Sequence, residues 1–182
     1  MGDPSLSRMH RLAASNLEDA LRHFNAGPTG PAAEFVELKL QACMFQYDVC
    51  AEMIAFLRNK PRGFAASVSL KGLVLNLFEY DRTLNKTFIP RLIALAAARG
   101  VPFDKMDVKE ARRAWKEEMK NLRKWSTVRD HAAAHYDGNV KRQITVLRSL
   151  DALEVMDVAK AFLSFNMALL VGLAEVGRGV RR

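Results

Sequence analysis

The sequence contains few residues that interrupt helices or cross-link chains. Its 182 residues include 10 glycines, 6 prolines and 2 cysteines, and 49% of them are hydrophobic. This composition excludes a disordered chain and favours a helix-rich globular protein. Cys43 and Cys50 lie seven residues apart on one face of one predicted helix, a spacing that does not allow an ordinary disulfide. We therefore expect two small core residues in a reducing compartment, with a regulatory thiol as the alternative.

The sequence also has little that resembles a targeting or membrane segment. The first residues, Met1–Ser5, are not followed by the apolar run of a signal peptide. The most apolar stretch, Ala161–Val176, is interrupted by Asn166 and Glu175 and is shorter than a membrane-spanning helix requires. These features predict a cytoplasmic protein without a membrane partner.

Several common catalytic signatures are missing as well. The sequence has no phosphate-binding glycine loop, nucleophile elbow or Cys-x-x-Cys motif, and no carboxylate set close enough for a two-metal nuclease. His131 and His135 have the i, i+4 spacing that suits metal chelation, but no glutamate lies between them and no third ligand is evident. We therefore predict no metal or other cofactor. A metal site completed by Glu52, Glu79 or Asp81 from neighbouring helices is the alternative.

Apolar residues at helical spacing predict an all-α fold, an up-and-down bundle of about five helices in one domain covering residues 1–182. The predicted helices cover residues 5–25, 32–59, 66–99, 104 or 107 to 135, and 150–176. Pro90 lies inside the third helix and predicts a kink or break near Phe88–Ile89. Asp107 and Glu110 are the expected capping pair of the fourth helix. The connector at residues 139–149 is compatible with an extended segment.

Positive charge is concentrated in one part of the chain. The formal net charge is +8, and residues 99–148 contain 13 Lys and Arg against 7 Asp and Glu. On the fourth predicted helix, basic residues recur every three or four positions as Lys109, Arg113, Lys116, Lys120, and Arg123 or Lys124. The same helix turns Trp115, Met119 and Leu122 toward the core. Such a basic stripe favours a polyanion or an acidic partner, and a solvated helix face is the alternative.

The basic stripe leads into Arg129–Asp137, which reads Arg-Asp-His-Ala-Ala-Ala-His-Tyr-Asp. Arg129-Asp130, four further residues and His135 resemble the Arg-(four to six residues)-His motif of the HEPN superfamily, and the surrounding run is similar to its abortive-infection branch. The resemblance implies a helical domain that dimerises and brings two motifs into one cleft. Active members are metal-independent endoribonucleases, often toxins or antiphage effectors. Some members carry a tyrosine two positions after the histidine, where an antitoxin modifies it, but Asp137 occupies that position here.

The chemistry of RNA cleavage suits these residue types. RNA supplies its own nucleophile, the 2′-hydroxyl, so cleavage needs a proton carrier and a cation but no metal-bound water. Histidine titrates near neutrality and arginine matches phosphate oxygens, which makes His135 and Arg129 the predicted catalytic pair. Six residues of regular helix leave them about 120° apart, so they converge only if the helix unwinds near His135 or a second chain contributes. Asp130 is expected to orient one of them, and a surface charge or helix-end ion pair is the alternative.

The remaining site predictions follow from position along the same helix. The expected cleft residues beside the catalytic pair are His131, Tyr136 and Asp137, and the expected RNA contacts are Lys116, Lys120, Arg123 and Lys124. We thus expect a homodimeric ribonuclease that acts on RNA as a toxin or antiphage effector, with an antitoxin protein as a candidate partner. The alternatives are a non-catalytic HEPN-like module that binds RNA or a partner protein, and a metal-binding or structural bundle.

Overall fold

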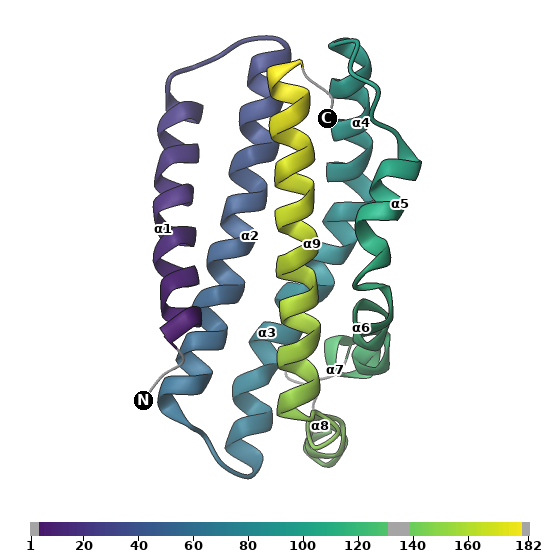
Figure 1. Cartoon of the computed structure of the whole chain (residues 1–182). Helices are drawn as coiled ribbons and strands as arrows, with labels where there is room; N and C mark the ends of the chain where they lie inside the picture. The colour runs from purple at the N-terminus through teal and green to yellow at the C-terminus, as the bar shows by residue number, and fades with distance from the viewer. Residues whose placement is uncertain (1–3, 131–138, 180–182) are drawn as a thin grey trace.

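The computed structural model describes residues 4–130 and 139–179, and every regular element in these ranges is helical. The long helices run up and down side by side, with α9 crossing the front of the bundle between α1 and α2 on one side and α4 and α5 on the other (Figure 1). These long helices are α1 (Pro4–Asn25), α2 (Pro31–Asn59), α3 (Phe64–Thr83), α4 (Ile89–Ala98) and α9 (Ala152–Arg178). The prediction of an all-α helical bundle is confirmed.

Helix α9 supplies much of the core. Its Phe162 and Phe165 are almost completely buried, and its one buried polar side chain, Asn166, is fully hydrogen-bonded within the core. Asn166 accepts a hydrogen bond from the Tyr80 hydroxyl and donates one to the Ala42 carbonyl oxygen at 3.1 Å. A buried amide with both groups satisfied costs little stability and ties α9 to α2 and α3.

Helix α9 is longer than the apolar stretch recognised in the sequence. At 27 residues it is longer than the apolar stretch Ala161–Val176. Among the described residues it is the one helix that is long and apolar enough to cross a membrane, and the mean hydropathy of its most apolar 18 residues is 1.5. In the bundle, 61% of these 18 residues are buried. The helix is therefore not too short to span a membrane, as its apolar stretch alone suggested, and the absence of membrane contact stays a prediction.

The third predicted helix is interrupted next to Pro90. Helix α3 ends at Thr83, the segment η1 (Leu84–Phe88) is π-helical, and α4 begins at Ile89 with Pro90 in its first turn. Proline lacks an N–H, and its ring clashes with the carbonyl group four residues earlier, so a regular α-helix does not continue through it undistorted. The helix is thus distorted where a kink or break was predicted, and the distortion takes the form of this π-helical segment, through which the backbone stays helical.

The fourth predicted helix is divided into short pieces. They are α5 (Lys105–Arg113), α6 (Lys116–Asn121), the 3₁₀ segment η2 (Leu122–Trp125) and α7 (Ser126–Val128). The Asp104 carboxylate caps α5 by accepting from the backbone N–H of Met106 at 2.6 Å, and the Asp107 carboxylate accepts from the backbone N–H of Asp104 at 2.8 Å. The predicted pair Asp107–Glu110 is wrong by one turn, because Asp104 already has the extended backbone that an N-cap residue adopts.

The connector between the last two predicted helices is itself helical. Helix α8 (Val140–Leu147) begins after Asn139, whose side chain accepts from the backbone N–H of Arg142 at 3.0 Å. The extended alternative is therefore wrong, because an asparagine cap and one apolar face suffice for two helical turns. With α3 and α4 separated and the fourth segment divided, the predicted count of about five helices is not confirmed.

The two cysteines of α2 lie in the core. Cys43 and Cys50 are both free and buried. Burial raises the pKa of the Cys43 thiol and raises that of Cys50 to about 11, so both remain protonated at neutral pH. The prediction of two small core residues is confirmed, and the reducing compartment stays a prediction.

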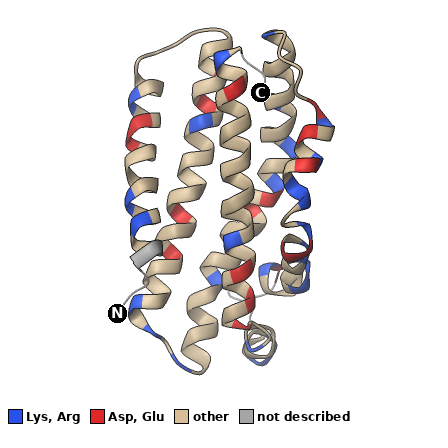
Figure 2. Ribbon diagram, in the orientation of Figure 1, with Lys and Arg blue, Asp and Glu red and all other residues tan. Residues whose placement is uncertain are grey.

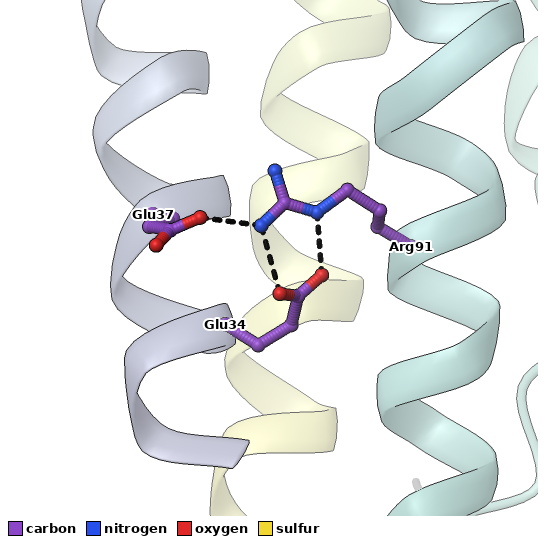
Figure 3. Close-up of polar contacts among 3 residues, drawn as sticks. All are labelled: Glu34, Glu37 and Arg91. Carbon is purple, nitrogen blue, oxygen red and sulfur yellow. Dashed lines mark hydrogen bonds and ion pairs between the residues drawn. The ribbon is translucent and has the colours of Figure 1, made fainter. Parts of the chain in front are cut away.

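An arginine on α4 links that helix to the start of α2 (Figure 3). The Nε and Nη2 groups of Arg91 donate to the two carboxylate oxygens of Glu34 at 2.5 and 2.7 Å, and Nη2 also donates to Glu37 at 2.5 Å. Hydrogen bonding by Arg91 holds the pKa of Glu34 below its ordinary value of 4.5. This two-point contact holds α2 and α4 in register on the side of α4 opposite α5.

Candidate nucleic-acid interface

The basic residues of the fourth predicted helix lie along one edge of the bundle. Blue segments recur down α5 and α6 on the side away from α1 (Figure 2). Val108 of α5, Met119 of α6 and Leu122 of η2 face the core, because they occupy the apolar positions of the pattern. Trp125 is buried and Trp115 packs against the core, so the prediction that Trp115 faces the core is confirmed.

A cavity of about 560 Å³ lies between α3, α5 and α6, and we call it the basic cavity. Its apolar lining consists of Phe78, Met106, Met119 and Leu122. Its charged lining consists of Lys109, Arg112, Arg113, Lys116, Lys120 and Arg123, with Asp81 and Glu110 as the acidic residues. Positive charge around an apolar surface suits a ligand with phosphate groups and an apolar body.

Arg112 is held in place on the wall of the basic cavity. Its guanidinium carbon lies 4.8 Å from the ring centroid of the buried Phe165, and its Nη2 donates to the Asn85 amide oxygen at 3.2 Å. Its Nε is buried and finds no acceptor among the described residues. Packing and the contact with Asn85 thus fix this arginine on the wall of the basic cavity, where its positive charge favours an anion.

The structure separates two neighbouring residues that were both predicted to contact RNA. Lys116, Lys120 and Arg123 line the basic cavity, whereas Lys124 does not and instead pairs with Glu154 at 2.5 Å. Consecutive residues of a helix point in directions more than 90° apart, so the cavity takes one of the two. Lys116, Lys120 and Arg123 thus share the basic cavity, Lys124 lies outside it, and RNA contact by all four stays a prediction.

A second cavity, of about 840 Å³, adjoins the first, and we call it the Arg129 cavity. Its lining consists of Phe78, Glu79, Asp81, Arg82, Asn85, Lys86, Arg123, Ser126, Arg129 and Asp130. Phe78, Asp81 and Arg123 line both cavities. The basic cavity and the predicted catalytic arginine therefore lie on one continuous stretch of surface.

Arg129 is oriented by two contacts. Its Nε donates to the Asp130 carboxylate at 2.7 Å, and its guanidinium carbon lies 5.0 Å from the ring centroid of Phe78. The hydrogen bond from Arg129 to Asp130 raises the pKa of the guanidinium, so this side chain stays charged. Its side chain is 42% exposed, and its Nη groups make no hydrogen bond to another described residue. They are free to bind an anion in the Arg129 cavity.

The backbone changes geometry at the motif. Arg129 and Asp130 are π-helical, directly after the last α-helical turn of α7. Such π-helical turns occur frequently at functional sites, because they change the direction in which side chains project. The contact with Arg129 is one of the roles expected for Asp130. The other predicted cleft residues, His131, His135, Tyr136 and Asp137, lie outside the described residues, and so does any contact between the catalytic pair.

Several residues of this surface were not singled out from the sequence. Arg82 and Lys86 enter the Arg129 cavity from α3 and η1, and Arg112 enters the basic cavity from α5. The available signal was the spacing of buried Tyr80 and Leu84, which leaves Arg82 and Lys86 on the outer face. Glu79 and Arg82 form an exposed pair at 3.7 Å, while Tyr80, between them in sequence, lies in the core.

No protein-family model, curated protein or solved structure matches this chain. Within residues 4–130 and 139–179, no three His, Cys, Asp or Glu side chains gather as a metal site would require. The fold and the site together define a class, an all-helical bundle with a basic, partly apolar cavity next to an oriented arginine.

Proposed function

We propose that this chain is a HEPN-like, metal-independent endoribonuclease that acts on RNA as a homodimer. The observation that carries the proposal is the position of Arg129, which lines a cavity continuous with the basic cavity through Arg123. A polyanion bound along the Lys and Arg side chains of α5 and α6 would extend to the Arg129 guanidinium. The Arg-x5-His sequence supplies the second support, because it adds a proton carrier six residues later.

The proposed reaction uses only groups of the RNA and of this chain. The 2′-hydroxyl attacks the adjacent phosphorus atom, and its proton passes to a general base. The bond to the 5′-oxygen of the next nucleotide breaks, and that oxygen takes up a proton, which leaves a 2′,3′-cyclic phosphate and a 5′-hydroxyl. His135 carries protons in these steps, and the Nη groups of Arg129 stabilise the negative charge that develops on the phosphorane oxygens.

The contacts of Arg129 fit this role. Asp130 occupies Nε at 2.7 Å and Phe78 supports the guanidinium face, so the two Nη groups remain for phosphate oxygens. Holding the side chain before substrate binds lowers the entropy lost in the transition state. Lys116, Lys120 and Arg123 would contact flanking phosphates and supply affinity without reading sequence.

We also propose homodimerisation. On a regular helix Arg129 and His135 would point about 120° apart, so they converge either by unwinding of the helix or by the contribution of a second chain. The HEPN resemblance favours the second route, in which the motif of a second copy completes each site. A nuclease of this kind requires control in the cell. We therefore propose a role as a cytoplasmic toxin or antiphage effector held inactive by a partner antitoxin protein.

The test is cleavage of end-labelled RNA in excess EDTA. Wild-type protein is expected to cleave and to leave 2′,3′-cyclic phosphate ends, whereas His135→Ala should lose about 10²–10⁴-fold in rate because the proton carrier is gone. Arg129→Ala should lose a comparable factor, and Arg129→Lys should retain part of the rate because it keeps the charge without the fork of donors. Arg22→Ala, which removes an exposed arginine of α1, is the matched control and should cleave normally.

Each other outcome has a distinct meaning. Cleavage that persists in both alanine variants would show that Arg129 and His135 are not the catalytic residues. Wild-type protein that binds RNA without cleaving it would favour the alternative, a non-catalytic HEPN-like module, which the basic cavity alone also supports. Cleavage that disappears in EDTA would contradict a metal-independent mechanism.

A further inference from the structure

The basic cavity has more apolar surface than a phosphate-binding groove needs. Phe78, Met106, Met119 and Leu122 form part of its lining, and Met106 is 63% exposed. A methionine that is mostly exposed to water beside basic residues contributes nothing to phosphate binding. A thioether packs favourably against an aromatic ring, which is the chemistry that a nucleobase offers.

We propose that the basic cavity accepts one unstacked nucleobase of a bound RNA and so selects single-stranded RNA over duplex. The base would lie against the apolar lining, with the flanking phosphates on the Lys and Arg side chains around it. The inference rests on the proposed RNA-binding function, but it does not require catalysis by Arg129 or His135.

The size and polar groups of the cavity fit this ligand. Its volume of about 560 Å³ lies in the range of pockets that hold small organic ligands, and a lone phosphate would leave most of it empty. Lys109, Arg112 and Lys116 line the cavity and offer N–H donors to the carbonyl oxygens and ring nitrogens of a base. Asp81 and Glu110 offer carboxylate oxygens to exocyclic amino groups.

Single-stranded RNA follows from the shape of the site. A base in a duplex is paired and stacked, so entering a cavity between helices requires that it first be unstacked. In a single strand, unstacking a base costs much less free energy. The Arg129 cavity adjoins the basic cavity through Phe78, Asp81 and Arg123, which favours a base of the same RNA chain over a free nucleotide.

The experiment measures binding in EDTA with His135→Ala protein, so that cleavage does not enter. Two labelled ligands of equal length are compared by fluorescence anisotropy: a short single-stranded RNA and the same ribose-phosphate chain without bases. The base-containing RNA should bind about 5- to 150-fold more tightly, the effect of one stacked base. Adding Met106→Glu should bring this ratio close to one, because a carboxylate now borders the apolar lining. The base-free ligand corrects for the added charge.

The matched control is Met44→Glu in the same background. Met44 is 51% exposed on α2, outside the basic cavity, and undergoes the same change of side chain and charge, so it should leave the ratio unchanged. A duplex of the same sequence should bind more weakly than the single strand by a factor similar to that of the base-free ligand.

Two results would overturn the inference. One is that the His135→Ala protein binds RNA and the base-free ligand equally, or that Met106→Glu leaves the ratio of the two affinities unchanged. Either outcome would show that the cavity holds no base. The other is competition by a free mononucleotide that matches the RNA in affinity and in sensitivity to Met106→Glu, since the ligand is then a free nucleotide. Loss of cleavage with these binding ratios intact would refute only the proposed ribonuclease function.

Discussion

The salt dependence of RNA binding provides a quantitative test of where the positive charge acts. The structure places Lys116, Lys120 and Arg123 on the wall of the basic cavity. For single-stranded nucleic acid, the logarithm of the affinity falls with the logarithm of salt concentration by about 0.7 for each phosphate contact. Changing all three residues to glutamine should therefore reduce this slope by about 2. Over a fourfold rise in salt, the wild-type affinity should fall about 20-fold more than that of the triple variant.

A second triple variant separates location from net charge. It carries Arg11→Gln, Lys39→Gln and Lys160→Gln, which also remove three positive charges. None of the three lines the basic cavity, Arg11 is exposed on α1, and Lys160 pairs with Asp157 at 3.1 Å. We expect its slope to match that of the wild type when anisotropy is measured from about 50 to 200 mM salt. Equal slopes in the two triple variants would refute the assignment of the basic cavity as the RNA contact surface.

Two further predictions concern the bundle that holds this surface. Arg91→Met should lower the free energy of unfolding by about 1–2 kcal/mol at neutral pH, because a bidentate ion pair is lost. Since Arg91 holds the pKa of Glu34 below 4.5, this stabilisation is fully present above about pH 4.5 and is lost as the pH falls through the lowered value. The free energies of unfolding in urea of wild type and variant should therefore approach each other as the pH falls below 4.5. A difference between them that is independent of pH would contradict the role of the ion pair. Tyr80→Phe should cost about 1–3 kcal/mol in the same assay, because it leaves the buried Asn166 oxygen without a donor. Tyr47→Phe, at a half-buried tyrosine of α2, is the matched control and should cost less. An equal loss of free energy of unfolding in both variants would show that the hydrogen bond from Tyr80 to Asn166 does not stabilise the fold.

Local patterns predicted the features that depend on a few consecutive residues. Helical spacing of apolar residues identified the long helices, and Pro90 located the break before α4, because a missing N–H acts on its own turn. Burial of Cys43 and Cys50 was predicted from their position on the apolar face of α2. The cap of α5 was predicted one turn too late. Asp104 and Asp107 are both suitable N-cap residues, and the extended backbone at Asp104 decides that the helix begins there.

The candidate site was predicted in part. The basic stripe and Arg129 were found from sequence, because their spacing follows one stretch of chain. The sequence did not predict that Arg123 lines the basic cavity and Lys124 does not. This difference depends on the 3₁₀ geometry of η2 and on Glu154, which follows Lys124 by 30 residues and lies on α9. The apolar part of the basic cavity was also missed. Phe78 comes from α3, and nothing in its local pattern shows that α5 and α6 lie opposite it.

The sequence by itself determined which residues avoid water, where the third predicted helix is interrupted and which stretch carries the positive charge. These properties arise from side-chain chemistry and from interactions over a few residues. Only the tertiary structure brought Arg82 and Lys86 beside Arg129 and enclosed an apolar cavity among basic side chains. That arrangement depends on how α3, α5 and α6 rotate as they pack, and packing is decided by contacts between segments that are distant in the chain.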